Sequence, residues 1–347
     1  MPGKVLTSAD SEDRDRIVAA FREVAGPAGL ILANLEAPIT KAQDPREDKL
    51  YNLKAEHESL DLFDDRFVLG LANNHIMDFG TEGLLDTLSA LRAKGLRYCG
   101  AGSTLKDAAQ PSFAELNGTT FAFIAAADPR YAAAGDGLPG TCPASESLLR
   151  ETVNALKPDV HVVCVSLHLG MEFVPAPTPL MRELARTCID AGASVVAFHH
   201  AHCLSGWTRL GHGAVLWGLG NFFFPHCGPR GYKPWFDTAR WDIRVDGSGE
   251  VRDVGIHPAV LKHNGEVRSA PGHDAKRIMV TIGKWSRHIQ SDRHALYWRI
   301  RCLLRLGYLR AALGNYVQIL QRKGFRYVLR VMMSTIKVHF AHGRETP

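Results

Sequence analysis

The chain has 347 residues, of which 46% are hydrophobic and 22% charged, a composition typical of a globular protein whose core needs no disulfides. No run of 18 or more apolar residues occurs, which argues against a membrane-spanning helix, and the first residues lack the basic and apolar regions of a secretory signal. The seven cysteines are scattered without a C-x-x-C pair, and we interpret them as buried structural thiols. We therefore expect a cytoplasmic protein.

The formal net charge of +5 is unevenly distributed, because residues 276–347 contain 15 Lys and Arg and few acidic residues. Such a basic region suggests an anionic partner. Residues 298–306 mix Arg with Trp and Leu, as interfacial helices do, which favours peripheral binding to an anionic membrane surface. The alternative is a helical face that packs on the body or on a second subunit of a homo-oligomer. No recognised module surrounds it, so we expect no specific nucleic acid.

The first 225 residues alternate between short apolar, β-branched runs and amphipathic stretches, which predicts an α/β fold with a largely buried sheet. The predicted strands are residues 30–33, 67–71, 121–125, 160–167, 194–198 and 215–218. The predicted helices are residues 13–24, 83–93, 144–156 and 179–191. Later, a turn signal at residues 246–249 separates two predicted antiparallel strands, 243–245 and 251–256.

From about Lys276 the pattern changes to apolar residues at spacings of three and four, with Arg and Lys between them. The helical stretches are 295–306, 308–320 and 327–338, with breaks at Gly307 and Gly324. We therefore divide the chain into a body of residues 1–265 and a basic, helical C-terminal appendage of residues 276–347.

Polar side chains follow five of the predicted strands directly, where α/β folds place their sites. They are Asn34, Glu36, Asn74, His75, Asp78, His168, Glu172, His199, His200, His202 and Asn221. Each alone has a structural explanation, such as a helix cap or a buried histidine, but these do not explain convergence on one sheet edge. His200 and His202 are two residues apart, so on an extended segment their rings would face the same way.

Imidazole, carboxylate and amide ligands together suit Zn²⁺, Mn²⁺ or Fe²⁺ rather than Ca²⁺. A bridging carboxylate with ligands on both sides would hold two ions about 3.5–4 Å apart, which polarise a substrate oxygen and activate a water molecule. Histidines that are not ligands can act as general acids or bases. The residues therefore predict a site for one or two divalent ions.

The order of these motifs resembles the CapA family of poly-γ-glutamate capsule biosynthesis proteins, whose domain is similar to the calcineurin-like metallophosphoesterases. The matching stretches are A-N-L-E-A-P at 33–38, L-A-N-N-H at 71–75 with D-F-G at 78–80 and Gly83, G-A-G at 100–102, S-L-H-L-G-M-E-F at 166–173, I-D-A-G-A at 189–193, H-H-A-H at 199–202 and L-G-N-F at 219–222. The resemblance implies a metallophosphoesterase-like α/β/β/α sandwich.

Site roles follow from the resemblance at the matching positions. It implies that Glu36 is a bridging carboxylate, that Asn74, His168 and His200 complete one metal site, and that His202 belongs to the other. His75 would be the catalytic acid or oxyanion-stabilising group.

Other polar residues are expected around this centre. Asp78 lies beside His75 in the motif and is expected to assist catalysis. The residues expected to orient ligands or touch the substrate are Asn34, Glu172, His199 and Asn221.

Some positions depart from the family pattern. The family's first strand ends in Gly-Asp, and the nearest match here is residues 5–10 with Asp10. Phe198 and Ala201 replace the usual Gly and Pro, and Leu169 replaces a Trp.

Two functions remain open. One is a metal-dependent hydrolase or transferase acting on phosphate or acyl/amide groups, with an anionic polymer or a phosphate-containing substrate. The other is a non-catalytic polymer-binding or scaffold protein with a degraded metal site.

Overall fold

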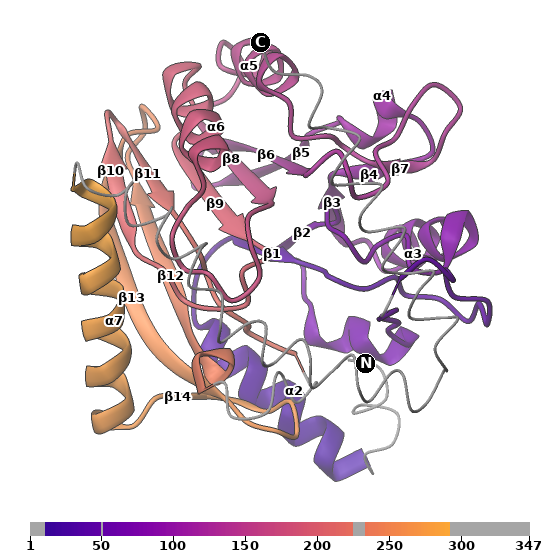
Figure 1. Ribbon diagram of the computed structural model, residues 1–347, viewed down its shortest axis with the longest axis horizontal. Coiled ribbons are helices and arrows are strands. Elements are labelled where there is room, and N and C mark those ends of the chain that lie inside the picture. The colour runs from indigo at the N-terminus through magenta and orange to yellow at the C-terminus, as the bar shows by residue number, and fades with distance from the viewer. Residues whose placement is uncertain (1–10, 50, 225–232, 292–347) are drawn as a thin grey trace.

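The computed structural model describes residues 11–49, 51–224 and 233–291 (Figure 1). Its largest layer is a six-stranded sheet in the order β10-β11-β9-β8-β6-β5. The strands are β5 (Ser112–Leu116), β6 (Thr119–Ala127), β8 (Val162–His168), β9 (Val195–His199), β10 (Trp207–Leu210) and β11 (Gly213–Leu216). The inner strands are parallel and the two edge strands are antiparallel.

Three smaller sheets complete the strand structure. A parallel sheet contains β1 (Ile31–Asn34), β2 (Phe67–Gly70) and β3 (Arg97–Cys99). An antiparallel sheet contains β12 (Asp237–Val245), β13 (Val251–Leu261) and β14 (Val267–Ser269). A two-stranded ribbon joins β4 (Ala101–Gly102) to β7 (Gly140–Thr141). The predicted turn at residues 246–249 connects β12 and β13.

The helices cover the outer faces of the sheets. They are α2 (Ser11–Ala25), α3 (Gly80–Ala93), α4 (Leu105–Ala108), α5 (Glu146–Leu156), α6 (Pro179–Asp190) and α7 (Gly272–Gln290), with short 3₁₀ helices η1 (His57–Leu62) and η2 (Lys233–Phe236). Thr178 caps α6, since its hydroxyl accepts a hydrogen bond from Met181 N at 3.2 Å, and Pro179 follows as the first helical residue.

Apolar clusters establish the order of the layers. Helices α5 and α6 share an apolar cluster with the six-stranded sheet, to which Leu149, Leu184 and Val165 belong. Helices α2 and α3 share a second cluster with β2. Between the sheets, Val68 of β2 packs against Phe123 of β6. The layers are therefore helix, sheet, sheet and helix, which confirms the predicted α/β/β/α sandwich.

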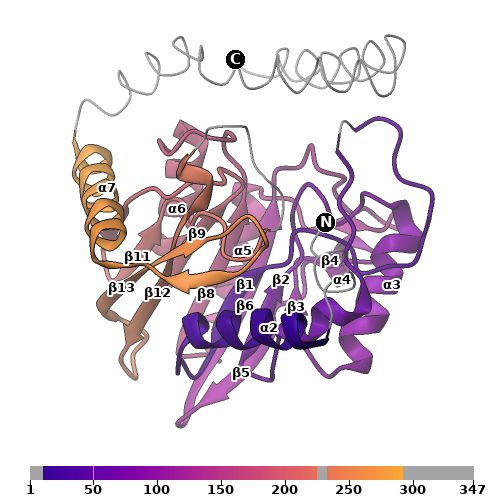
Figure 2. The ribbon, with the colours of Figure 1, turned by 90° about the horizontal axis from the view of Figure 1, so that it is seen from below.

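Helix α7 is the part of the predicted C-terminal appendage that the structure describes. It begins at Gly272 and lies alongside β13 (Figures 1 and 2). It packs against β10 and β13, and its buried residues include Ile278, Ile282 and Trp285. The remaining helical predictions, at residues 292–347, and Asp10 at the other end lie outside the described residues. No helix in the described ranges combines the length and the apolar character needed to cross a bilayer.

The strand register brings the polar strand ends to one edge. In the smaller parallel sheet, Asn34 at the end of β1 pairs with Gly70 at the end of β2. In the larger sheet, His168 at the end of β8 pairs with His199 at the end of β9. Because parallel strands end at the same edge, the residues that follow them meet in space.

Candidate metal centre

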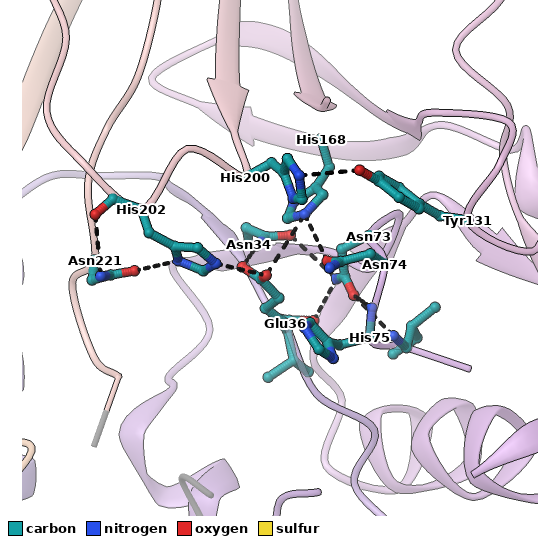
Figure 3. Close-up of polar contacts among 12 residues, drawn as sticks. Asn34, Glu36, Asn73, Asn74, His75, Tyr131, His168, His200, His202 and Asn221 are labelled. Carbon is teal, nitrogen blue, oxygen red and sulfur yellow. Dashed lines mark hydrogen bonds and ion pairs between the residues drawn. The ribbon is translucent and has the colours of Figure 1, made fainter. Parts of the chain in front are cut away.

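Glu36 lies among the polar side chains gathered at this edge (Figure 3). One carboxylate oxygen, Oε2, accepts a hydrogen bond from Asn34 Nδ2 at 3.0 Å. The other, Oε1, is buried and has no hydrogen-bond partner among the described residues. It faces two imidazole nitrogens, Nε2 of His202 at 3.5 Å and Nε2 of His168 at 3.6 Å. Both distances exceed the usual N–H···O range of about 2.7–3.2 Å.

Asn221 determines which nitrogen of His202 carries the hydrogen. Asn221 Nδ2 donates to the carbonyl oxygen of Trp235 at 3.2 Å, which orients the amide so that its Oδ1 lies 2.8 Å from His202 Nδ1. Since an amide oxygen can only accept, Nδ1 must donate, and Nε2 of the neutral ring carries a lone pair. That lone pair faces Glu36 Oε1, and two such atoms repel unless a cation or a proton lies between them.

The remaining predicted ligands complete the group. His168 Nε2 lies 2.9 Å from Asn74 Oδ1. The ring of His200 has its centroid 5.1 Å from that of His168 and 6.4 Å from that of His202, and its Nδ1 is buried without a hydrogen-bond partner in the described structure. The predicted ligands therefore lie in one cluster drawn from both sheets.

Burial keeps the imidazoles of the cluster neutral. Together with neighbouring imidazoles, it lowers the pKa of His168 well below the usual value, that of His199 to about 4 and that of His200 to about 3. Burial also raises the pKa of Glu36 to about 7, an effect that the nearby His75 opposes and Glu172 increases. Neutral imidazole is the form that binds a metal, and a cation would offset the cost of burying the carboxylate.

The backbone of the histidine loop differs from the prediction of an extended segment. Strand β9 ends at His199, and His200 and His202 have φ angles of 86° and 51°, in the left-handed region that non-glycine residues seldom adopt. Phe173, from the loop after β8, has a φ of 63°, and its N–H donates to the carbonyl of Ala201 at 2.8 Å. The prediction of an extended segment that carries both rings is wrong, because the backbone is left-handed at His200 and His202. Backbone strain of this kind concentrates at functional sites.

His75 and Asp78 form a pair next to the cluster. His75 Nδ1 lies 2.6 Å from Asp78 Oδ2, and Asp78 is fully buried. The same carboxylate also accepts hydrogen bonds from Lys49 Nζ and from the N–H of Leu53. Its contact with His75 places the imidazole hydrogen on Nδ1 and leaves Nε2 as the reactive nitrogen.

Three residues that the strand-end pattern did not single out also support the site. Tyr131 Oη lies 3.0 Å from His200 Nε2. Lys49 Nζ donates to the carbonyl of Asn74 at 2.5 Å. Asn73 Oδ1 accepts from the N–H groups of His75 and Ile76 at 3.0 and 2.9 Å, which holds the turn that carries Asn74. Only Asn73 had a sequence signal, as the first residue of the Asn-Asn pair.

An apolar cavity adjoins the cluster. It has a volume of about 340 Å³ and is lined by Glu36, His199 and His202 together with apolar side chains that include Phe123 and Trp241. Next to His202, the ring of Trp235 lies with its centroid at 4.9 Å and that of Phe224 at 5.2 Å. The polar cluster therefore lies in low-dielectric surroundings, where charge interactions are strong.

The donor set can be compared with what a metal ion needs. Within the part of the chain that the structure describes, no three His, Cys, Asp or Glu side chains are already drawn together as a metal-binding group. The contacts are pairwise instead: Glu36 with His168 and with His202, and His168 with Asn74. The chemistry still fits a divalent transition ion, because it combines imidazole nitrogen, amide oxygen and a carboxylate oxygen without a hydrogen bond.

The sequence also matches a known protein family. Residues 1–226 match the model of the family described as bacterial capsule synthesis protein PGA_cap. The chain belongs to the PGA_cap family. The match extends past Asn221 and so covers the whole candidate centre, and it confirms the resemblance drawn from the motifs. Phe198, which departs from the usual motif of this family, is accommodated in the core by stacking on Trp217 with ring centroids 5.3 Å apart.

Two curated relatives illustrate the similarity. The PGA biosynthesis protein CapA of Bacillus subtilis is 30% identical over 260 residues, which cover 72% of this chain and 67% of that protein. The capsule biosynthesis protein CapA of Bacillus anthracis is 30% identical over 205 residues, which cover 56% and 50%. The chain thus spans about half to two thirds of the length of these relatives.

Similarity to solved structures is weaker. A hypothetical protein from Thermus thermophilus gives a TM-score of 0.41 at 14% identity and covers 72% of this chain and 95% of its own. The sulfate thiohydrolase SoxB of Thermus thermophilus gives 0.40 at 13% identity, with 64% and 37% coverage.

Proposed function

We propose that this member of the capsule and poly-γ-glutamate biosynthesis family is a metal-dependent hydrolase or transferase that acts on phosphate or acyl/amide groups of an anionic polymer or a phosphate-containing substrate. Mn²⁺, Zn²⁺ or Fe²⁺ would be the cofactor. The polymer comes from the relatives, whose names concern capsule and PGA biosynthesis. The metal chemistry comes from the residues of this chain.

One observation carries the proposal: buried Glu36 Oε1, which has no hydrogen-bond partner among the described residues, lies 3.5 Å from His202 Nε2. A protein does not ordinarily bury two hydrogen-bond acceptors against each other, because each then loses its partners in water. A divalent cation between them would change this repulsion into attraction. His168 Nε2 lies 3.6 Å from the same oxygen and would bind the same cation by giving up its contact with Asn74 Oδ1 at 2.9 Å.

Glu36, Asn74, His168, His200 and His202 would hold one or two ions. When bound, such an ion supplies a Lewis acid that polarises a substrate oxygen and lowers the pKa of a bound water. The residues of this chain supply the rest. Asn34 holds one oxygen of Glu36. His75, fixed by Asp78 at Nδ1, would give the proton of Nε2 to a leaving oxygen or nitrogen when the imidazole is protonated on both nitrogens.

The competing function is a non-catalytic polymer-binding or scaffold protein. It is favoured by the pairwise character of the contacts, since no three His, Cys, Asp or Glu side chains within the described ranges form a ready metal-binding group. On this hypothesis the site holds one ion or none, and the protein has no hydrolytic turnover.

Metal content after His200→Ala tests the proposal. We expect the purified wild type to bind one or two equivalents of Mn²⁺ or Zn²⁺ and to hydrolyse a generic phosphodiester such as bis-p-nitrophenyl phosphate. We expect His200→Ala to lose most of the bound metal and of the turnover while keeping its fold. The matched control is His273→Ala, because the His273 side chain is 88% exposed on α7. Equal metal content in wild type and His200→Ala would contradict the ligand assignment.

A further inference from the structure

We propose that Tyr131 is a positioning residue that holds His200 in the tautomer presenting Nδ1 to a divalent cation. The inference rests on the proposed metal centre and assigns a role to a residue outside its ligand motifs. Tyr131 lies in the loop after β6, and its hydroxyl oxygen is 3.0 Å from His200 Nε2 (Figure 3).

Hydrogen bonds within the loop after β6 fix the position of Tyr131. Tyr131 N–H donates to the carbonyl of Asp128 at 2.8 Å, and the hydroxyl of Thr141 donates to the carbonyl of Tyr131 at 3.1 Å. Arg130 stabilises the same turn through a bidentate ion pair with the Asp128 carboxylate, at 2.8 and 2.5 Å. Tyr131 can therefore serve as a rigid partner for the imidazole.

The phenol also packs over the imidazoles of the cluster. Its ring centroid lies 5.4 Å from that of His200 and 6.3 Å from that of His168. A phenol hydroxyl can either donate or accept a hydrogen bond.

Two hydrogen placements are compatible with the contact between Tyr131 Oη and His200 Nε2. If the phenol donates, the hydrogen of the neutral imidazole moves to Nδ1, where it would be a buried N–H without an acceptor, since Nδ1 has no partner among the described residues. If Nε2 donates to the phenol oxygen, Nδ1 carries a lone pair instead. Buried donors without an acceptor are rarer than acceptors without a donor, and a lone pair is what a cation binds. The geometry therefore favours the second placement.

Asn221 has the corresponding role at His202, where the two ring nitrogens are exchanged. Asn221 accepts from Nδ1 of His202 and leaves Nε2 with the lone pair. Hydrogen-bond partners on the far nitrogen commonly fix the tautomer of metal-binding histidines, and their removal costs about 10- to 100-fold in metal affinity. Tyr131 would fill this role for His200.

The test uses the full chain in two measurements. Long-range ¹H–¹⁵N correlation spectra of metal-free protein labelled on histidine, at pH 7.5, should show His200 with an unprotonated Nδ1, the signal being assigned by its loss in His200→Gln. Tyr131→Phe should give a mixture of the two tautomers and should bind Mn²⁺ about tenfold more weakly in calorimetry. Tyr98→Phe is the matched control, because it removes a hydroxyl that accepts from Arg92 Nε at 2.9 Å near the surface.

The outcomes separate this inference from the metal centre itself. If His200→Ala loses Mn²⁺ binding while Tyr131→Phe matches wild type in affinity, the role of Tyr131 is overturned and the metal centre stands. A wild-type His200 protonated at Nδ1 would overturn the inference without any variant. If His200→Ala keeps full Mn²⁺ affinity, the metal centre fails, and the inference with it.

Discussion

Lys49 Nζ lies against the buried carboxylate of Asp78, although the two residues come from separate loops. The same ammonium group donates to the carbonyl of Asn74 at 2.5 Å and lies 3.2 Å from His75 Nδ1. Asp78 also accepts from Leu53 N–H at 2.6 Å, in the loop that carries Lys49. These contacts join Lys49 and Leu53 to the turn that carries Asn74, a predicted ligand, and His75, the predicted acid.

Replacing Lys49 with Met should weaken both the fold and the centre. The variant leaves a fully buried carboxylate with one charged partner fewer, and we expect the free energy of unfolding to fall by about 2 kcal/mol. Because the carbonyl of Asn74 loses its donor, Mn²⁺ affinity should fall several-fold. Chemical unfolding and calorimetry measure the two effects. Lys106→Met, on an exposed surface, should change neither. A Lys49→Met variant as stable as this control would show that the contact between Lys49 and Asp78 does not stabilise the fold.

Glu36→Gln should stabilise the metal-free protein in a pH-dependent way. Burial raises the pKa of Glu36 from 4.5 to about 7, so the folded state prefers the protonated carboxyl. Below pH 4.5 the group is neutral in both states and costs nothing. As the pH rises from 4.5 through 7, the carboxyl ionises more readily in the unfolded state, and the folded protein loses about 3 kcal/mol. Glutamine resembles the neutral form and avoids this loss.

Urea unfolding of wild type and Glu36→Gln at pH 4.5 and pH 8, with a chelator present, measures the difference. The two proteins should be equally stable at the lower pH, and the variant should be more stable at the higher pH. Saturating Mn²⁺ at pH 8 should reverse the order, because only the carboxylate binds the ion strongly. A variant less stable than wild type at pH 8 without metal would contradict this account of Glu36.

Asn221→Leu should reduce metal affinity through His202. Without the amide oxygen, His202 Nδ1 no longer has its acceptor at 2.8 Å, and the ring can place its hydrogen on Nε2. We expect Mn²⁺ affinity to fall about 10- to 100-fold. Asn221→Asp keeps an acceptor at this position and should lose less. Asn154→Leu on the exposed face of α5 is the control, and similar affinities for Asn221→Leu and Asn154→Leu would argue against the tautomer mechanism.

The outer face of α7 is expected to contact anionic lipid. Met279 and Val280 are 42% and 61% exposed there, and Lys276 and Lys284 lie beside them on the helix surface. Reversing both lysine charges to Glu should lower binding to phosphatidylserine vesicles at low salt at least tenfold, given about 1 kcal/mol per basic residue near such a surface. The control reverses Lys41 and Lys106. If the two double variants bind vesicles equally well in flotation, the predicted contact between α7 and the membrane is wrong.

Much of the sandwich could be predicted because its inner strands are buried on both faces and read as continuous apolar runs, as in β8 and β9. Strand ends in parallel sheets share an edge, so the sequence order of Glu36, His168 and His202 was enough to predict that they meet. Short strands such as β3 and β10 were not predicted, since three or four residues carry too little periodic signal.

The supporting contacts of the centre could not be predicted from sequence. Tyr131 and Lys49 lie in irregular loops, where no period relates a residue to the strand ends it will contact. Their positions depend on turns held by tertiary hydrogen bonds, such as that between Leu53 N and Asp78 Oδ2. The left-handed backbone at His200 and His202 is likewise disfavoured by local preference, and between these residues the carbonyl of Ala201 accepts a hydrogen bond from Phe173 N–H.

Anomalous X-ray diffraction from crystals grown with Mn²⁺, recorded on both sides of the metal edge, tests the central claim most directly. We predict an anomalous peak about 2.0–2.3 Å from Glu36 Oε1 and from Nε2 of His168 or His202, and its loss in Glu36→Gln crystals grown in the same way. A wild-type map without a peak within reach of Glu36, or a peak of equal height in the variant, would contradict the metal centre.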